Sequence, residues 1–214
     1  MNKLARLKNC HLYGILDLGY TPQENIIPVT QALLDGGIGI LQLRAKHHTP
    51  EQIETMAKQI APLCQEKNCL FIINDYPEIA KRVGADGVHI GQDDGNLAEI
   101  RQFLGNDIII GRSTHSYEQA INAYKEAADY IGFGPLYPTG TKPGRPAIGL
   151  DDIARVHREL PQEFPIYCIG GVNSATLPQV LSAGARRVVI VSWLLSQPDI
   201  SASTLQIRQQ LGEA

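Results

Sequence analysis

The sequence has few cysteines, few aromatic residues, no long hydrophobic run and almost no excess of charge. Its 214 residues include four cysteines, which form no CxxC pair: Cys10, Cys64, Cys69 and Cys168. This pattern is typical of reduced thiols, so we expect a cytoplasmic protein in which these cysteines form neither a disulfide framework nor a zinc site. No apolar run reaches the roughly 18 residues of a membrane-spanning helix, and the basic N-terminal segment lacks a signal peptide's apolar stretch.

The near balance of positive and negative residues limits the kinds of partner that the protein is expected to bind. The 19 Lys and Arg residues against 22 Asp and Glu residues give a net charge of −3, which argues against a broadly basic nucleic-acid-binding protein. The 43% apolar content is too high for disorder and is enough for one sizeable core. We therefore expect small-molecule partners, with neither nucleic acid nor membrane among them.

Short β-branched stretches alternate with stretches of helical periodicity along the whole chain. Strands are predicted at residues 12–17, 38–43, 70–73, 87–90, 108–111, 130–133, 166–169 and 188–191. The spacing leaves room for a helix between each pair, which favours parallel strands with helical crossovers. A doubly wound sheet is disfavoured because no GxGxxG follows the first strand. We predict an α/β fold, a single-domain (β/α)8 TIM barrel over residues 1–214 with its core at about 12–212.

Several helix starts are marked by capping residues. Thr49 with Gln52, and Ser116 with Gln119, have the spacing of capping boxes. Asn96 is predicted to cap one helix, and Asn173 or Ser174 another. The first helix has two candidate starts, at Pro22 and at Pro28.

Polar side chains follow the predicted strands, where a barrel of this kind carries its active site. On the second strand Gln42, Arg44 and Lys46 alternate onto one face. An arginine and a lysine together suit a phosphate or diphosphate, although a solvated strand end would look the same. The pairs Asn74-Asp75 and Asp93-Asp94 follow the next two strands, and carboxylates from these strand ends could share one Mg²⁺; the alternative is ordinary turn chemistry.

Later strand ends carry further candidates. The segment 139–144 (TGTKPG) is either an anion-binding loop or a plain surface loop. Gly170, Gly171, Val191 and Ser192 end the last two strands, where barrels bind phosphate, unless they form only tight turns. His115 ends the fifth strand and is a candidate for proton transfer.

Taken in order, these segments resemble the thiamine-phosphate synthase family (thiamine-phosphate pyrophosphorylase) from residue 12 to about residue 195. The matching segments are 42–46 (QLRAK), 73–75 (IND), 84–94 (GADGVHIGQDD), 111–115 (GRSTH), 134–135 (GP), 138–142 (PTGTK), 169–171 (IGG) and 191–192 (VS). The resemblance implies a transferase that joins an aminopyrimidine diphosphate to a thiazole phosphate, carboxylated or not, by Mg²⁺-assisted dissociative substitution. The products would be thiamine phosphate and diphosphate.

The same resemblance implies residue roles. The pyrimidine diphosphate would be held by Gln42, Arg44, Lys46, Asn74, Ser113 and Lys142, of which Arg44, Lys46, Ser113 and Lys142 are the catalytic candidates. Thr139, Thr141, Gly171, Val191 and Ser192 would hold the thiazole phosphate, and Asp75 and Asp94 the Mg²⁺. A homo-oligomer is compatible with this assignment.

Two alternatives stay open at this point. A sister family with the same fold is a thiazole tautomerase that uses a histidine at the position of His115. A non-catalytic binder of thiamine intermediates is the other alternative. Departures from the synthase pattern are Arg112, where a small apolar residue is usual, Trp193, and residues 144–146 (GRP).

Overall fold

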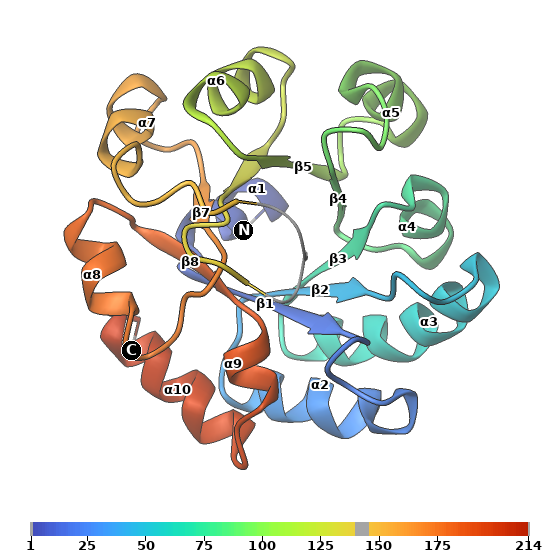
Figure 1. The fold of residues 1–214 in the computed structure, drawn as a ribbon. Helices are drawn as coiled ribbons and strands as arrows, with labels where there is room; N and C mark the ends of the chain where they lie inside the picture. The colour runs from blue at the N-terminus through green and yellow to red at the C-terminus, as the bar shows by residue number, and fades with distance from the viewer. Residues whose placement is uncertain (1, 140–145, 214) are drawn as a thin grey trace.

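Eight parallel strands close into a barrel in the computed structural model, which describes residues 2–139 and 146–213. Each strand pairs with the next, and β8 pairs with β1 (Figure 1). The strands are β1 (Leu12–Asp17), β2 (Ile40–Arg44), β3 (Leu70–Asn74), β4 (Gly87–Ile90), β5 (Ile109–Thr114), β6 (Tyr130–Phe133), β7 (Ile166–Cys168) and β8 (Arg187–Ile190). The predicted fold class, a single-domain (β/α)8 barrel, is confirmed.

Helices surround the barrel and bury their apolar faces against the outside of the strands (Figure 1). They are the 3₁₀ turn η1 (Gln23–Asn25), α2 (Ile26–Asp35), α3 (Pro50–Glu66), α4 (Pro77–Val83), α5 (Leu97–Leu104), α6 (Tyr117–Lys125), α7 (Ile153–Glu159), α8 (Leu177–Ser182), α9 (Ser192–Leu195) and α10 (Ile200–Gln210). The strand predictions differ from the structure by at most three residues at either end. The differences matter most at β2 and β5, which extend far enough to carry rim residues within the sheet.

Two of the predicted helix caps form as expected. The Thr49 side chain accepts a hydrogen bond from the Gln52 amide, and the Gln52 side chain accepts one from the Thr49 amide. Asn96 caps α5. At the first helix both candidates contribute, because Pro22 precedes η1 and Pro28 lies in the first turn of α2.

The other two caps differ from the prediction. Ser116 caps α6, but the side chain of Gln119 accepts from the amide of His115 instead of closing a box with Ser116. The cap predicted at residue 173 or 174 is wrong, since α8 begins at residue 177 after Thr176. Asn173 forms a turn instead, in which its side-chain oxygen accepts from the amides of Ala175 and Thr176. Asn and Ser compete with helices in this way, through hydrogen bonds to nearby amides.

An unpredicted helix, α1 (Lys3–Asn9), covers the N-terminal end of the barrel (Figure 1). Its buried Leu7 packs with side chains of the barrel interior. The hydroxyl of Tyr167 donates to the carbonyl oxygens of Leu7 at 2.9 Å and Cys10 at 3.1 Å. The helix therefore forms the floor of the barrel, and the mouth lies at the C-terminal ends of the strands.

Three tyrosine rings fill the lower part of the barrel interior. The ring of Tyr13 lies with its centroid 5.9 Å from that of Tyr130 and 5.4 Å from that of Tyr167, the latter edge to face. Gly111 makes room for this packing, because a Cβ atom there would lie 2.1 Å from the Tyr130 ring. The tyrosines raise the bottom of the interior, and the space above them stays available at the mouth.

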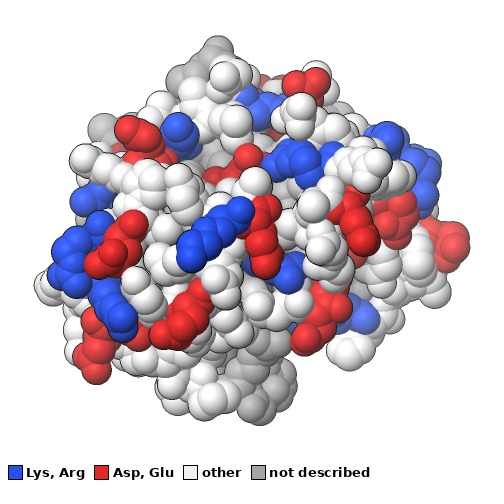
Figure 2. Space-filling model, turned by 90° about the horizontal axis from the view of Figure 1, so that it is seen from above, with Lys and Arg blue, Asp and Glu red and all other residues white. Residues whose placement is uncertain are grey.

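The outer surface mixes charges of both signs. On the face seen in Figure 2, Lys and Arg side chains lie among Asp and Glu side chains, with no broad patch of one sign. Among the described residues, no helix has both the length and the apolarity needed to span a bilayer.

Candidate active site

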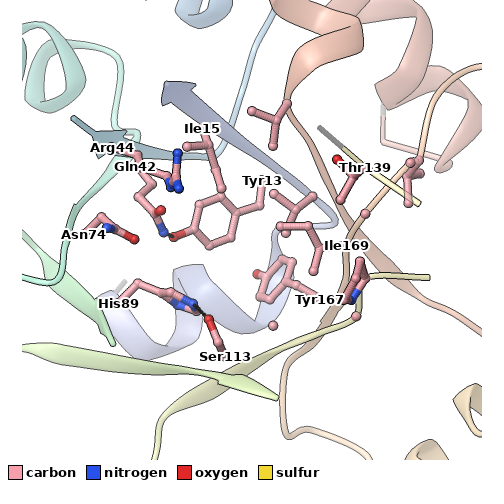
Figure 3. A pocket seen from close by; sticks show the side chains of 18 of the residues that line it. Tyr13, Ile15, Gln42, Arg44, Asn74, His89, Ser113, Thr139, Tyr167 and Ile169 are labelled. Atoms are coloured by element: carbon pink, nitrogen blue, oxygen red, sulfur yellow. Dashed lines mark hydrogen bonds between the residues drawn. The ribbon is translucent and has the colours of Figure 1, made fainter. Parts of the chain in front are cut away.

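A cavity of about 870 Å³, open to solvent, occupies the mouth of the barrel (Figure 3). We call it the aromatic cavity. Its lower wall is made of aromatic and aliphatic side chains: Tyr13, Ile15, Tyr130, Tyr167, Ile169, Val189 and Val191. Polar groups gather on the side formed by β2 to β5: Gln42, Arg44, Asn74, His89 and Ser113. The arrangement suits a flat ring with hydrogen-bonding groups on one edge.

A hydrogen-bonded chain runs through this cavity from one side of the barrel to the other. The Gln42 amide donates to the Tyr13 hydroxyl at 2.7 Å, and the hydroxyls of Tyr13 and Tyr130 share a bond of 3.0 Å. His89 Nδ1 then bonds the Tyr130 hydroxyl at 3.0 Å, and His89 Nε2 bonds Ser113 Oγ at 2.9 Å. Burial raises the pKa of both tyrosines far above the usual range, which keeps them neutral.

A second, charged cavity of about 650 Å³ adjoins the first. We call it the ionic pocket. It is lined by Arg44, Lys46, Asn74, Asp75, Gly91, Gln92, Asp93, Asp94 and Ser113. Three residues, Arg44, Asn74 and Ser113, line both cavities. A ligand that lies along these shared residues can place a ring in one cavity and an anionic group in the other.

Arg44 is held at the boundary by a buried carboxylate. Its Nη1 lies 2.6 Å from Asp17 Oδ2, and the Asp17 side chain is 2% exposed. Asp17 Oδ1 also accepts from the amide of Gly19 at 2.9 Å, so the carboxylate is fixed by the chain turn that follows β1. The Nε donor of Arg44 is buried without a hydrogen-bond partner in the described structure. An unsatisfied buried donor costs free energy.

Asp75 occupies a strained position directly after β3. Its φ of 66° is left-handed, which is uncommon outside glycine and tends to occur at functional sites. Its carboxylate forms an ion pair with Lys46 and accepts from the Asn74 amide at 2.6 Å. Burial raises the pKa of Asp75, Lys46 opposes that rise, and the neighbouring carboxyl of Asp94 adds to it. The Asp94 carboxyl therefore disfavours charge on Asp75, an effect that a cation bound at Asp75 would offset.

The charges of the ionic pocket explain which ligand fits it. Both of its described cations already have a carboxylate partner, Arg44 with Asp17 and Lys46 with Asp75. Asp93 and Asp94 add further negative charge. Among the described residues, positive charge is thus too scarce to hold a diphosphate alone, and a divalent cation would restore the balance.

The donor set fits a hard cation that also takes ligands from its substrate. Within residues 2–139 and 146–213, no cluster of three or more His, Cys, Asp or Glu side chains is placed to hold a metal. Asp75 and Asp94 offer carboxylate oxygens only, the ligand type that Mg²⁺ prefers. Mg²⁺ commonly takes one or two carboxylates and completes its shell with water and phosphate oxygens.

The opposite wall of the aromatic cavity comes from β6 to β8. It includes Thr139, Gly171, Val191 and Ser192, four of the predicted thiazole-phosphate residues. Gly170 and Gly171 have φ values of 98° and 68°, and a Cβ at either would lie within 2.6 Å of the neighbouring loop. Glycine is therefore required for the two loops to pack together. The predicted site residues Thr141 and Lys142, with loop positions 144 and 145, lie outside the described residues.

The remaining candidates also have definite places. His115 lines the aromatic cavity, and its Nδ1 donates to the Gly134 carbonyl at 2.5 Å. Arg112 lies outside both cavities and binds two backbone carbonyls of the loop after β4. Trp193 packs against the hydrophobic core and is not among the described residues lining either cavity.

Sequence reasoning missed the roles of Tyr13, Tyr130 and Tyr167, and it left His89 as a core or rim residue. A signal for the first two was present, because alternate residues of a strand share a face. Tyr13 is separated from the rim residue Asp17 by an even number of positions, so the two side chains share a face of β1. The same spacing from the loop after β6 places Tyr130 on the interior face of β6.

The closed parallel barrel, with two cavities at the C-terminal ends of its strands, defines the class of (β/α)8-barrel proteins that carry a site at this mouth. The sequence profile of one such family, thiamine monophosphate synthase, matches residues 12–194. The chain belongs to this family.

Known relatives agree with this assignment. The chain is 39% identical to a thiamine-phosphate synthase of Thermus thermophilus over 94% of this chain and 98% of the relative. It is also 39% identical to one of Synechocystis sp., over 97% of this chain and 59% of the relative. A solved thiamine phosphate pyrophosphorylase of Pyrococcus furiosus superposes with a TM-score of 0.86 at 28% identity, covering 98% of each chain. The chain thus spans about three-fifths of the length of the cyanobacterial relatives.

Proposed function

We propose that this protein is a thiamine-phosphate synthase, a transferase that joins an aminopyrimidine diphosphate to a thiazole phosphate. The observation that carries the proposal is the boundary between the two cavities, where Arg44, Asn74 and Ser113 line both. A substrate made of an aromatic ring attached to a diphosphate has one part for each cavity. Membership of the family supports the same reaction.

The pyrimidine ring would lie in the aromatic cavity. Gln42, Asn74 and Ser113 present amide and hydroxyl groups there, which match the donors and acceptors of an aminopyrimidine. His89 orients Ser113, and Tyr13 orients Gln42, through the hydrogen-bonded chain. The ring would therefore be selected by its polar edge and held by the apolar wall.

The diphosphate would lie in the ionic pocket beside Arg44 and Lys46, with Lys142 as the third predicted cation. Asp75 and Asp94 would hold the Mg²⁺, since both line this pocket and Asp94 disfavours charge on Asp75. Bound there, Mg²⁺ would neutralise negative charge on the diphosphate. Lys46 already contacts Asp75, so the same lysine would lie close to a phosphate held there through a cation on Asp75.

The thiazole phosphate would approach from the wall made by Thr139, Gly171, Val191 and Ser192. Thr141 belongs to the same predicted set. The hydroxyls of Thr139 and Ser192 supply hydrogen bonds to phosphate oxygens, and Gly171 allows a close approach of the backbone. This places the second substrate across the cavity from the diphosphate.

The reaction breaks one C–O bond and forms one C–N bond. The bond between the pyrimidine methylene carbon and the diphosphate oxygen breaks, and its electron pair leaves with the diphosphate. Arg44, Lys46 and Lys142 stabilise the negative charge that grows on that leaving group. The thiazole nitrogen then supplies the electron pair for the new bond to the methylene carbon. Holding both rings in one cavity favours this step by proximity.

The direct test mixes the two phosphorylated precursors with the protein and Mg²⁺ and measures thiamine phosphate and diphosphate. We expect equal amounts of both products, and a loss of at least a hundredfold in Asp75→Ala. A carboxylated thiazole phosphate supplied as the second substrate shows which form is used. Absence of product, or unchanged turnover in Asp75→Ala, would contradict the proposal.

A thiazole tautomerase is the second candidate, and one observation favours it. His115 faces the aromatic cavity with its Nδ1 proton donated to Gly134, the tautomer whose Nε2 can act as a base. Metal-independent isomerisation of a carboxylated thiazole phosphate, lost in His115→Ala, would identify that activity. Binding of one precursor without turnover of either kind would identify a non-catalytic binder. A cytoplasmic location and a homo-oligomeric state stay predictions.

A further inference from the structure

Arg112 is a buried arginine that the proposed reaction does not use. It lies in β5 between Gly111 and Ser113, both of which face the barrel interior. Successive strand residues point to opposite faces, so Arg112 projects to the outside of the barrel. It is nevertheless only 8% exposed, which is rare for arginine unless the guanidinium is fully engaged.

The guanidinium of Arg112 spans the loop that follows β4. Its Nη1 donates to the carbonyl of Gly95 and its Nη2 donates to the carbonyl of Gln92, both at 3.0 Å. The side-chain amide of Gln92 donates a hydrogen bond of 2.6 Å to the carbonyl of Ser113. Three hydrogen bonds thus tie this loop to one segment of β5.

The two carbonyls bound by Arg112 lie on either side of Asp94 in the chain. Asp94 itself adds local bonds, since its Oδ2 accepts from the Gly91 amide at 3.0 Å and its amide donates to the Gly91 carbonyl at 3.3 Å. Asp94 and Asp75 both line the ionic pocket, and the Asp94 carboxyl is near enough to raise the pKa of Asp75. The position of Asp94 relative to Asp75 therefore depends on how the segment 91–95 is held.

We propose that Arg112 is a positioning residue for the divalent cation: its two-carbonyl clamp holds the segment 91–95 so that Asp94 stays opposite Asp75. This inference rests on the proposed function, because it assumes that these two carboxylates bind a cation together with diphosphate. A planar fork suits two carbonyls, whereas the point-like ammonium of lysine does not reproduce it. Arg112 thus sets metal affinity without touching metal or substrate.

The test measures metal binding rather than turnover. Mn²⁺ is titrated into the intact protein in the presence of inorganic diphosphate and followed by electron paramagnetic resonance, for the wild type, Arg112→Met and Arg112→Lys. We expect the dissociation constant of Mn²⁺ to rise about tenfold in both variants, the size typical when support of a metal ligand is lost. In the assay, KM for Mg²⁺ should rise by a similar factor while kcat at saturating Mg²⁺ changes less than twofold.

Arg101 provides a matched control at the opposite end of the same barrel. Its Nη1 donates to the carbonyls of Ile108 at 2.5 Å and Gly105 at 3.3 Å, and its Nη2 pairs with Asp129. Arg101→Met removes comparable backbone bonds, so it should lower stability and leave Mn²⁺ binding unchanged. Amide hydrogen exchange at Gly91 and Asp94 should accelerate in Arg112→Met and not in Arg101→Met.

The outcomes separate this inference from the proposed function. If the wild type shows no diphosphate-dependent Mn²⁺ binding, the metal site itself fails and the role of Arg112 fails with it. If the wild type binds and Arg112→Met binds equally well, the site stands and the positioning role is wrong. If Arg112→Lys keeps wild-type affinity while Arg112→Met loses it, the charge matters rather than the clamp, and the inference is overturned.

Discussion

The imidazole of His89 joins the barrel interior to the mouth, with Nε2 2.9 Å from Ser113 Oγ and Nδ1 3.0 Å from the Tyr130 hydroxyl. Contacts at both nitrogens fix the plane and direction of the ring. The direction of the Ser113 hydroxyl, which faces both cavities, is thereby linked to a buried tyrosine.

Removing the Tyr130 hydroxyl tests this link. In Tyr130→Phe the ring still fills the interior, but Tyr13 and His89 each lose one hydrogen bond. We expect the free energy of unfolding in urea to fall by about 1–3 kcal/mol, and KM for the pyrimidine diphosphate to rise severalfold. Tyr167→Phe is the control, since its hydroxyl binds backbone at the floor, and it should lose stability without a change in KM. Equal KM values in the two variants would contradict the link.

The buried ion pair of Asp17 with Arg44 should contribute more to stability than a surface pair. Asp17→Asn replaces the charged partner of a largely buried guanidinium, so the free energy of unfolding should fall by about 1–3 kcal/mol. The comparison is Asp35→Asn, whose partner Lys67 lies in solvent, and there the loss of stability should be much smaller. Urea unfolding of both variants measures the difference, and equal losses would show that the Asp17 pair is not a buried anchor.

Gly111 should tolerate no side chain. A Cβ there would lie 2.1 Å from the Tyr130 ring, so Gly111→Ala forces the tyrosine packing apart and should cost about 3 kcal/mol. Gly132→Ala is the matched variant on the neighbouring strand, where the nearest atom would be 3.5 Å away, and its effect should stay within about 1 kcal/mol. Thermal unfolding ranks the two, and a Gly111→Ala protein as stable as the wild type would refute this packing.

Acid should destabilise the protein through His157. Burial, with Arg186 and Arg187 nearby, lowers the pKa of His157 from 6.5 to about 4, and its Nε2 is buried without a hydrogen-bond partner in the described structure. Between pH 4 and pH 6.5 His157 is protonated in the unfolded chain and neutral in the folded chain. Its contribution to the free energy of unfolding is therefore complete above pH 6.5 and is lost as the pH falls toward 4. The free energy of unfolding of the wild type should fall between pH 7 and pH 5, and in His157→Gln this fall should be smaller by about 1–2 kcal/mol. Urea unfolding at the two pH values measures the difference. An unchanged pH dependence in the variant would contradict this assignment.

Local sequence signals predict the barrel because each strand and each helix start carries a signal of its own. β-branched runs such as 70–73, and the box of Thr49 with Gln52, specify a strand and a helix start without help from the rest of the chain. The rim residues were predictable for a related reason, since the ends of parallel strands must meet at one face once the barrel is accepted.

Contacts between segments that are far apart in the sequence cannot be predicted from these local signals. The pairing of Asp17 with Arg44 depends on the register of β1 against β2, which no single segment specifies. The floor formed by α1 depends on Leu7 packing among residues from several strands. The cap of α8 was misplaced because Asn173 satisfies its side chain in a turn just before the helix.

The central claim is that the ionic pocket holds a diphosphate through a divalent cation shared by Asp75 and Asp94. Calorimetric titration of inorganic diphosphate, with and without Mg²⁺, tests it most directly in the wild type and in the double variant Asp75→Asn/Asp94→Asn. We predict that Mg²⁺ tightens diphosphate binding at least tenfold in the wild type and not in the double variant. Equal diphosphate affinity with and without Mg²⁺ in the wild type, or a Mg²⁺ effect that survives in the double variant, would contradict the claim.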